Sequence, residues 1–253
     1  MNTHETLRLL GVSDDTLSSS QMNQLDDYGY FVVQGLLDEK QLKKFRYRLD
    51  ELYEKEGAEA GLELTHEVGC PRLTNLINKD QIFDICFTHP IVLAAVSHVF
   101  GSEFKTNSLN YRDALPHYGL QRLHPDHDHP VEPRDFFKCN ALWLIDPHTG
   151  ENGSTRFVPK SHLSGQHPRK AMANHYDPHP NEIILNEPAG TVVICNAHMW
   201  HGGTCNTSGE RRRTLHASFI KREFDQQLTE RDFIQPETYE RLSPAFRYLL
   251  DVN

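Results

Sequence analysis

The chain has 253 residues and a formal net charge of −9 at pH 7. This length suffices for one well-buried domain, and the negative charge argues against a nucleic-acid-binding surface. No apolar run approaches the ~18 residues of a membrane-spanning helix, and the N-terminus lacks the pattern of a secretory signal. The five cysteines are widely spaced without a Cys-x-x-Cys pair, so we expect no disulfide framework and a reducing, cytoplasmic location.

The first hundred residues predict a mostly helical segment. Residues 1–18 are polar, and we expect them to be poorly anchored. An apolar run from Tyr30 to Val33 between two glycines predicts a short strand. A helix should follow from Asp38, since Gln41 stands in the capping-box position and apolar residues then recur every three or four positions. Two further short helices are predicted at 80–87 and 89–101, which gives a helical cover over about 20–103.

The central part of the chain changes to short runs separated by turn residues. These runs predict strands at 104–112, 119–123, 136–146, 154–158, 182–185, 190–196 and 212–220. Such a series is typical of an all-β sandwich or barrel. A helical tail is expected over about 226–250. The simplest architecture is a single domain, residues 1–253, with one β core over about 104–220 covered by helices from both ends.

The stretch "LHPDHDHP", residues 123–130, concentrates metal-binding side chains. His124 and Asp126 are two positions apart, so both would point the same way on a strand and reach one ion. The pairs His127 with His129 and Asp126 with Asp128 have the same spacing, and a solvated loop is the alternative reading. The stretch does not fit the His-x-His-x-Asp-His pattern of binuclear zinc hydrolases.

A distant histidine follows the apolar strand "GTVVICN", at His198 or His201. Two histidines and one carboxylate form the facial triad of non-haem Fe(II) oxygenases, which leaves positions open for a bidentate co-substrate and O₂. The co-substrate's far carboxylate needs a buried cation, and arginine offers a bidentate one. Among the three consecutive arginines, alternation favours Arg212, because it shares a strand face with Thr214, His216 and Ser218. The alternative is that all three arginines are surface charges, as is usual for a run of arginines.

With these residues in place, the chain resembles the phytanoyl-CoA dioxygenase family of Fe(II)/2-oxoglutarate-dependent oxygenases. The resemblance lies in "YGYFVVQGLLDEKQLKKFRYRLDEL", "HPIVLAAVSHVFG", "LHPD", "LIDPHTGENGSTRFVPKSHLSG" and "HGGTCNTSGERRR", which occur in the family's order. It implies a mainly β fold, a double-stranded β-helix (jelly roll, cupin-like) core flanked by N-terminal and C-terminal helices. Lys160 stands where the family prefers glycine, which can alter a turn and bring a charge near the pocket.

The resemblance also implies roles for particular residues. It makes His124, Asp126 and His201 the Fe(II) ligands, and it puts Arg212 at the 2-oxoglutarate carboxylate. Asn140 and Ser208 are further candidates for contacting 2-oxoglutarate; the alternatives are a hydrogen-bonded buried amide for Asn140 and support of the turn for Ser208. Either Leu142 or Trp143 should face the pocket. The candidates for lining the substrate pocket are His127, His129, Arg112 and His216.

The activity implied is a dioxygenase that uses Fe(II), 2-oxoglutarate and O₂ and releases succinate and CO₂. Hydroxylation of a small molecule, for instance in secondary metabolism, is the expected outcome. Two alternatives stay open at this point, a non-redox metal-dependent hydrolase and a non-catalytic binding protein on the same barrel. The sequence leaves the substrate and the oligomeric state undetermined, and it predicts no nucleic-acid or membrane partner.

Overall fold

The computed structural model describes residues 1–64, 67–127 and 134–253. Within these ranges the strands form two antiparallel sheets, one of six strands in the order β1-β7-β4-β9-β3-β2 and one of three in the order β6-β5-β8. The strands are β1 (Tyr30–Val33), β2 (Arg72–Leu73), β3 (Phe104–Arg112), β4 (Lys138–Leu144), β5 (Thr155–Phe157), β6 (Ile183–Ile184), β7 (Val192–Asn196), β8 (His201–Gly203) and β9 (Thr214–Lys221).

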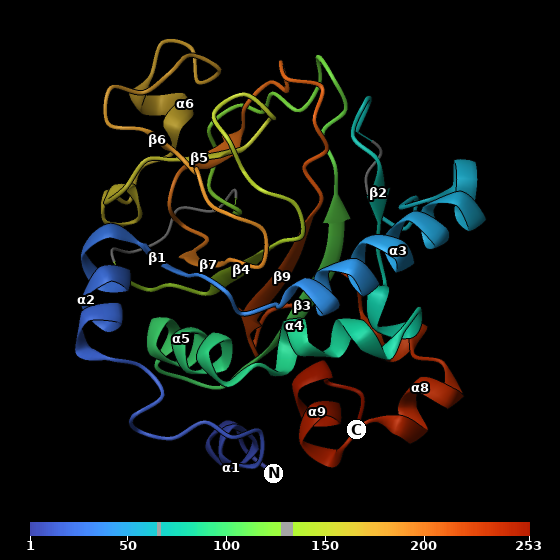
Figure 1. Cartoon of the computed structure of the whole chain (residues 1–253). Helices are drawn as coiled ribbons and strands as arrows, with labels where there is room; N and C mark the ends of the chain where they lie inside the picture. Colours follow the sequence, from blue (N-terminus) through green and yellow to red (C-terminus); the bar gives the residue numbers. More distant parts are fainter. Residues whose placement is uncertain (65–66, 128–133) are drawn as a thin grey trace.

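Helices cover one side of the larger sheet (Figure 1). The α-helices are α1 (Thr3–Leu9), α2 (Ser19–Tyr28), α3 (Glu39–Glu56), α4 (Ile85–Thr88), α5 (Pro90–Phe100), α6 (Pro168–Ala171), α7 (Glu230–Phe233), α8 (Pro236–Arg241) and α9 (Pro244–Leu250). Short 3₁₀ turns lie at Gly57–Glu59, Leu76–Asn78, Gln81–Asp84 and Ser161–Leu163. Helix α1 packs against α9, which brings the two ends of the chain together (Figure 1).

Alternation along the central strands separates a dry face from a functional one. On β4, Cys139, Ala141 and Trp143 belong to the main apolar core beneath the helices. The intervening Asn140 and Leu142 point to the other side, toward the smaller sheet. Strand β9 repeats this arrangement, with Leu215, Ala217 and Phe219 in the core. A period of two therefore places one polar row of each strand between the two sheets.

Several predicted elements are confirmed. The capping box of Asp38 and Gln41 begins α3, and Gly57 ends it. Pro90 takes the first turn of α5, and Gly101 caps it in the left-handed conformation. The strand predicted at 104–112 is β3.

Other predictions need correction. Residues 1–18 are anchored, because Thr3 is buried and donates hydrogen bonds from its N–H and hydroxyl to the Glu103 carboxylate. The range 119–123 forms no strand, whereas β8 and α2 were not anticipated. Both misses have a local cause: β8 is only three residues long, and the apolar stripe of α2 buries Leu25 alone.

Lys160 keeps the backbone conformation that favours glycine, with φ of 70°. Its N–H donates a hydrogen bond to the Tyr28 carbonyl oxygen, and its ammonium lies 5.1 Å from the centre of the Tyr28 ring. The turn is therefore retained, and the charge points to α2 instead of the pocket.

Within the described part of the chain, no single helix has both the length and the apolar character needed to cross a membrane. One bent pair, Gln81–Thr88 with Pro90–Phe100, meets those criteria only when its two halves are combined.

Candidate metal and co-substrate site

The backbone brings His124 and Asp126 beside the strand that carries His201. His124 and His201 form an antiparallel bridge, each N–H donating to the other's carbonyl oxygen at 2.9 and 3.0 Å. The Asp126 N–H donates to the Ala197 carbonyl oxygen at 2.9 Å. One potential ligand atom from each of the three side chains lies within 4.8 Å of the other two. Among the described residues these three side chains form the group able to hold a metal ion.

The imidazoles present the same nitrogen to the centre of this group. Nδ1 of His124 lies 2.8 Å from the Arg122 carbonyl oxygen, and Nδ1 of His201 lies 2.8 Å from that of Met199. A proton on each Nδ1 satisfies these carbonyls and leaves Nε2 as a metal ligand. The two Nε2 atoms lie 3.8 and 3.4 Å from Oδ1 of Asp126.

The electrostatics of the triad fit a divalent cation. Burial, with the nearby charge of His201, lowers the pKa of His124 to about 4. Burial acts to raise the pKa of Asp126, but His201 and His124 outweigh it and the pKa is lowered. For His201 the Asp126 carboxylate outweighs burial and raises the pKa. Two imidazoles and one ionised carboxylate are the donor set of non-haem Fe(II) sites.

Two residues of β4 hold Asp126 in place. The Asn140 side-chain amide donates a hydrogen bond to Oδ2 of Asp126, and the Lys138 ammonium donates to its carbonyl oxygen at 3.0 Å. Oδ1 is thereby left to face the histidines. Asn140 thus contacts a candidate ligand directly and also lines the cavity, and its contact with 2-oxoglutarate stays a prediction.

Arg212 is fully buried with an incompletely satisfied guanidinium. One terminal nitrogen donates to the Thr214 hydroxyl at 3.3 Å, whereas Nε and the other terminal nitrogen have no partner among the described residues. Burial, followed by repulsion from Arg112, lowers the pKa of Arg212 to about 9, so it stays charged at neutral pH. Buried charges in proteins are normally paired, so this guanidinium is suited to pair with a carboxylate that enters the cavity.

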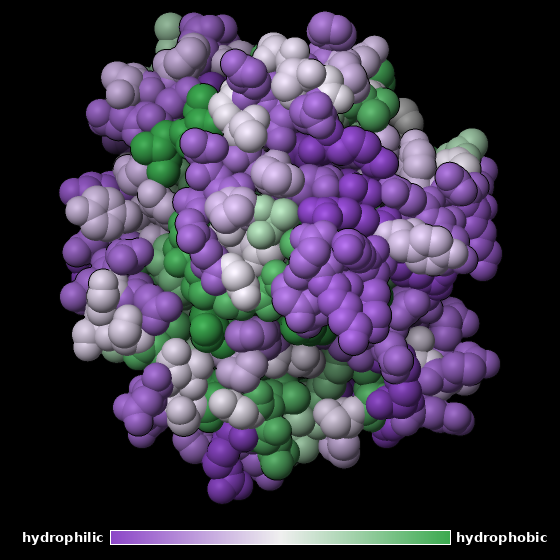
Figure 2. Space-filling model, in the orientation of Figure 1, coloured by the Kyte–Doolittle hydropathy of each residue, from purple (hydrophilic) through white to green (hydrophobic). Residues whose placement is uncertain are grey.

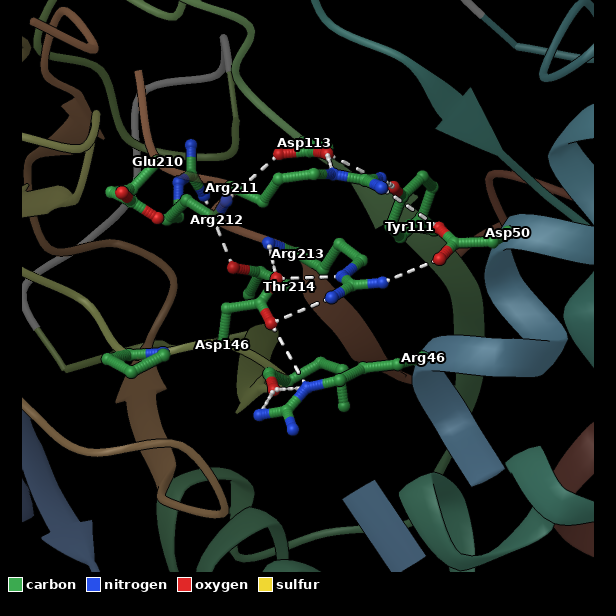
Figure 3. Close-up of polar contacts among 12 residues, drawn as sticks. Arg46, Asp50, Tyr111, Asp113, Asp146, Glu210, Arg211, Arg212, Arg213 and Thr214 are labelled. Carbon is green, nitrogen blue, oxygen red and sulfur yellow. Dashed lines mark hydrogen bonds and ion pairs between the residues drawn. The ribbon is translucent and has the colours of Figure 1, made fainter. Parts of the chain in front are cut away.

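The neighbouring arginines serve the scaffold. Figure 3 shows Arg211 and Arg213 directed toward α3, with the Arg212 side chain on the other side. Arg211 pairs with Asp113 at 2.7 Å and Arg213 with Asp146 at 2.7 Å. Asp113 also accepts the Arg212 N–H at 3.0 Å, so the carboxylates fix the backbone on both sides of Arg212. The alternation argument for Arg212 agrees with this placement.

A buried histidine, His148, orients the Thr214 hydroxyl that accepts the hydrogen bond from Arg212. Nε2 of His148 lies 2.9 Å from the Thr214 hydroxyl, and Nδ1 lies 3.0 Å from that of Ser154. Burial and the charge of Arg212 lower the pKa of His148, which keeps the ring neutral. A fixed Thr214 in turn restrains the Arg212 guanidinium.

The remaining predicted site residues have mixed placements. His127, Arg112 and His216 line the cavity, and so does Leu142, whereas Trp143 lies in the core under the helices. His129 lies outside the described residues.

Ser208 requires a correction, because it is exposed and does not line the cavity. Its hydroxyl donates to the Asn206 side chain at 3.2 Å and accepts the Glu210 N–H at 3.0 Å, which is a turn-forming role.

His198, the alternative third ligand, is turned away from the triad. Its Nε2 accepts the Phe137 N–H at 3.0 Å, and its ring packs on those of Phe137 and His127 at centroid distances of 4.7 and 4.4 Å. Burial, then the charge of His127, lowers the pKa of His198 to about 3. This geometry gives His198 a structural role.

The triad and Arg212 share one cavity of about 380 Å³ between the two sheets. Sequence reasoning missed several of its lining residues, including Arg72, Lys138 and Gln227. The alternation that identified Arg212 also applies to Lys138, which shares a face with Asn140. Arg72 comes from the two-residue strand β2, and Gln227 comes from the loop after β9. Neither segment is long enough or regular enough for periodicity to mark an inward position.

Comparison with known proteins identifies the family. The family model for phytanoyl-CoA dioxygenase (PhyH) matches residues 25–214. The chain belongs to this family. Dioxygenase trt7 of Aspergillus terreus is 27% identical over 228 residues, which cover 83% of this chain and 76% of that protein. Dioxygenase andF of Emericella variicolor is 25% identical over 256 residues, covering 93% and 85%. An uncharacterized protein of Mycobacterium tuberculosis is 26% identical over 224 residues, covering 86% and 80%.

Solved structures confirm the predicted jelly-roll, cupin-like fold. The non-heme alpha-ketoglutarate-dependent carbocyclase SnoK from nogalamycin biosynthesis superposes with a TM-score of 0.66 at 21% identity, covering 93% of this chain and 95% of that one. HygX from Streptomyces hygroscopicus, with nickel and 2-oxoglutarate bound, superposes with a TM-score of 0.65 at 16% identity. The match covers 83% of this chain and 89% of that one. With the family and the triad, these findings make the protein an Fe(II)/2-oxoglutarate-dependent dioxygenase, so the hydrolase and binding-protein alternatives lose their support.

Proposed function

We propose that the enzyme hydroxylates a small molecule at the cavity between its sheets. In this proposal His124, Asp126 and His201 hold Fe(II), and Arg212 pairs with the distal carboxylate of 2-oxoglutarate. The observation that carries the proposal is the fully buried, unpaired Arg212 guanidinium in the same cavity as the triad. A site without an anionic co-substrate would leave that charge uncompensated.

Bound Fe(II), with 2-oxoglutarate and O₂, supplies an oxidant strong enough to attack an unactivated C–H bond. The reaction balances as substrate C–H plus 2-oxoglutarate plus O₂ giving substrate C–OH, succinate and CO₂. The protein's part is positioning and exclusion of water. Asn140 orients the Asp126 carboxylate, Thr214 orients Arg212, and Leu142 with Phe157 supplies apolar surface to the cavity.

We further propose that residues 1–253 act as a single catalytic domain. The family match ends at residue 214, but α9 packs on β3, which lines the cavity. The Gln227 side chain, from the segment after β9, accepts the Ser108 hydroxyl at 2.7 Å. The C-terminal part therefore contributes to both the core and the site.

The proposal is tested by incubating the purified protein with Fe(II), 2-oxoglutarate and O₂ and quantifying succinate. Wild-type protein should form succinate slowly without a substrate, and His201→Ala should form none above the metal-only background. A compound that raises succinate formation and gains one oxygen atom from O₂ is a substrate. Equal succinate formation by wild type and His201→Ala would contradict the proposed ligand set.

A further inference from the structure

The cavity is unusually polar for a small-molecule site. Binding pockets are mostly lined by hydrophobic and aromatic side chains. Here the apolar contributions among the described lining residues are confined to Pro125, Leu142, Phe157 and Cys195, apart from two glycines. An apolar substrate would find few partners in such a cavity, and the volume of about 380 Å³ lies near the lower end for ligand pockets.

The lining also carries excess positive charge. Its described basic residues are Arg72, Arg112, Arg122, Lys138 and Arg212, whereas its described acidic residue is Asp126. The protein as a whole has a net charge of −9, and the face shown in Figure 2 is mostly hydrophilic with apolar patches near its centre. A basic cavity inside an acidic protein focuses a field that attracts anions.

The ion pairs of the cavity do not cancel this charge. Arg72 and Arg112 share one carboxylate, that of Glu67, and Arg112 also donates to the Gly119 carbonyl oxygen at 3.1 Å. Burial acts to raise the pKa of Glu67, but these arginines lower it to about 2, so it contributes a single negative charge. Bound Fe(II) and the 2-oxoglutarate dianion would cancel each other, which leaves the excess in place.

Two of these cations are accessible to solvent. Arg122 is exposed, and its guanidinium has no ion-pair partner within the described residues. Arg72 is partly exposed at 21%, and its Nε has no hydrogen-bond partner there. Burial is the main cause that lowers the pKa of His216 to about 3, and the charges of Arg212, Arg112 and Arg72 lower it further.

A row of neutral hydrogen-bonding groups continues along β3. The Asn110 amide donates to the Ser108 hydroxyl at 3.2 Å, and its carbonyl oxygen has no partner among the described residues. The Ser108 hydroxyl donates to Gln227 at 2.7 Å, and the Asn107 amide donates to Ser218 at 3.0 Å. Such a wall suits hydroxyl or amine groups on a ligand.

Building on the proposed function, we propose that the primary substrate is a small, polar molecule bearing a carboxylate or phosphate. Arg72 and Arg122 bind its anionic group within the cavity, and Asn110 with Gln227 binds its hydroxyl or amine groups. Arg212 stays occupied by 2-oxoglutarate.

The test uses protein loaded with Ni(II) and 2-oxoglutarate, which binds ligands without turnover. Calorimetric titrations compare glucose 6-phosphate, glucuronate, glucose and octanoate at fixed ionic strength. One of the two polar anions should bind at least tenfold more tightly than glucose and octanoate, and whichever binds better identifies the anionic group. The advantage should be lost in the double variant Arg72→Gln/Arg122→Gln and retained in Arg8→Gln, an exposed arginine of α1 outside the cavity.

The inference is contradicted if glucose or octanoate binds as well as the polar anions, or if the advantage survives in the double variant. The same titrations are repeated on Ni(II) protein without 2-oxoglutarate. An anion preference seen only in the absence of 2-oxoglutarate would mean that the probes occupy Arg212, and it would also overturn the inference. Binding of 2-oxoglutarate is titrated first. Its absence would contradict the proposed function, and the same probes on Ni(II) protein would then decide the substrate class separately.

Discussion

Asn140 donates a hydrogen bond to Oδ2 of Asp126, while Oδ1 of the same carboxylate lies 3.4 Å from Nε2 of His201. The amide thus binds one carboxylate oxygen of Asp126 and leaves the other facing the candidate metal position. Asn140 is itself held in the middle of β4, opposite Cys195 on β7 and Ser218 on β9. The sheet therefore sets the orientation of Asp126, the candidate metal ligand.

Asn140→Ala should weaken Fe(II) binding by roughly ten- to a hundredfold, as is typical when an outer partner of a metal ligand is lost. The Asp126 carboxylate would then rotate freely between both oxygens. Equilibrium dialysis of Fe(II) under anaerobic conditions measures the effect. Asn110→Ala, which lines the cavity away from Asp126, should bind Fe(II) like the wild type. Equal affinities in both variants would remove Asn140 from this role.

Arg212→Met should leave the ligand-free protein as stable as the wild type or more so, because it removes a buried charge with no ionic partner. The stabilisation that 2-oxoglutarate gives to the metal-loaded protein should be lost. Thermal unfolding with and without 2-oxoglutarate reports both effects. The matched Arg213→Met variant should unfold at lower temperature, because it removes the shorter of the two ion pairs of Asp146 and leaves Arg46 as its remaining partner. A 2-oxoglutarate-induced shift in Arg212→Met equal to that of the wild type would contradict the assignment.

Asp146→Asn should destabilise the fold by about 3 kcal/mol, because it breaks a buried ion pair. Asp146 accepts hydrogen bonds from Arg213 Nε at 2.7 Å and Arg46 Nε at 3.1 Å, and its side chain is only 9% exposed. Urea unfolding gives the difference in free energy. The control Asp135→Asn removes an ion pair with Lys221 in which the Asp135 side chain is 66% exposed. It should lower the free energy of unfolding by less than about 1 kcal/mol. Similar losses in the free energy of unfolding for the two variants would contradict a larger contribution from the buried ion pair.

Glu230→Gln should flatten the dependence of stability on pH. Glu230 is 1% exposed, and burial raises its pKa from 4.5 to about 7. Between these values the unfolded chain releases a proton that the folded protein keeps, so stability falls as pH rises. The difference between the two pKa values corresponds to a loss in the free energy of unfolding on the order of 3 kcal/mol, which is complete above pH 7. Urea unfolding from pH 4 to 8 should show this loss in the wild type and in the exposed control Glu237→Gln, but not in Glu230→Gln. If the stability of all three proteins falls with pH in the same way, Glu230 is not the source of this pH dependence.

The sequence predicts the fold best where local signals are strong. The caps of α3 and α5 and the extent of β3 follow from residue types within a few positions. The anchoring of α1 depends on Thr3 and Glu103, one hundred residues apart, and no local pattern encodes such a contact. The strand predicted at 119–123 fails because its backbone N–H groups pair with different segments, Gln121 with the Gly203 carbonyl oxygen and Leu123 with that of His175, and not with one continuous neighbouring strand.

For the site, alternation identifies Arg212, and the family resemblance selects His124, Asp126 and His201 from a cluster with several possible pairs. The family resemblance makes Ser208 a candidate for a co-substrate contact or for supporting the turn, and its hydroxyl is used by the turn. Arg72 reaches the cavity only because β2 pairs with the end of β3, placing Arg72 opposite Arg112. Such a pairing cannot be read from the two-residue strand alone.

The most direct test is the anaerobic visible absorbance of the protein with Fe(II) and 2-oxoglutarate, measured for the wild type, His201→Ala and His198→Ala. Chelation of Fe(II) by 2-oxoglutarate gives a weak charge-transfer band that needs both additions. The proposed ligand set predicts this band in the wild type and in His198→Ala and its absence in His201→Ala. A band that survives in His201→Ala and disappears in His198→Ala would contradict it.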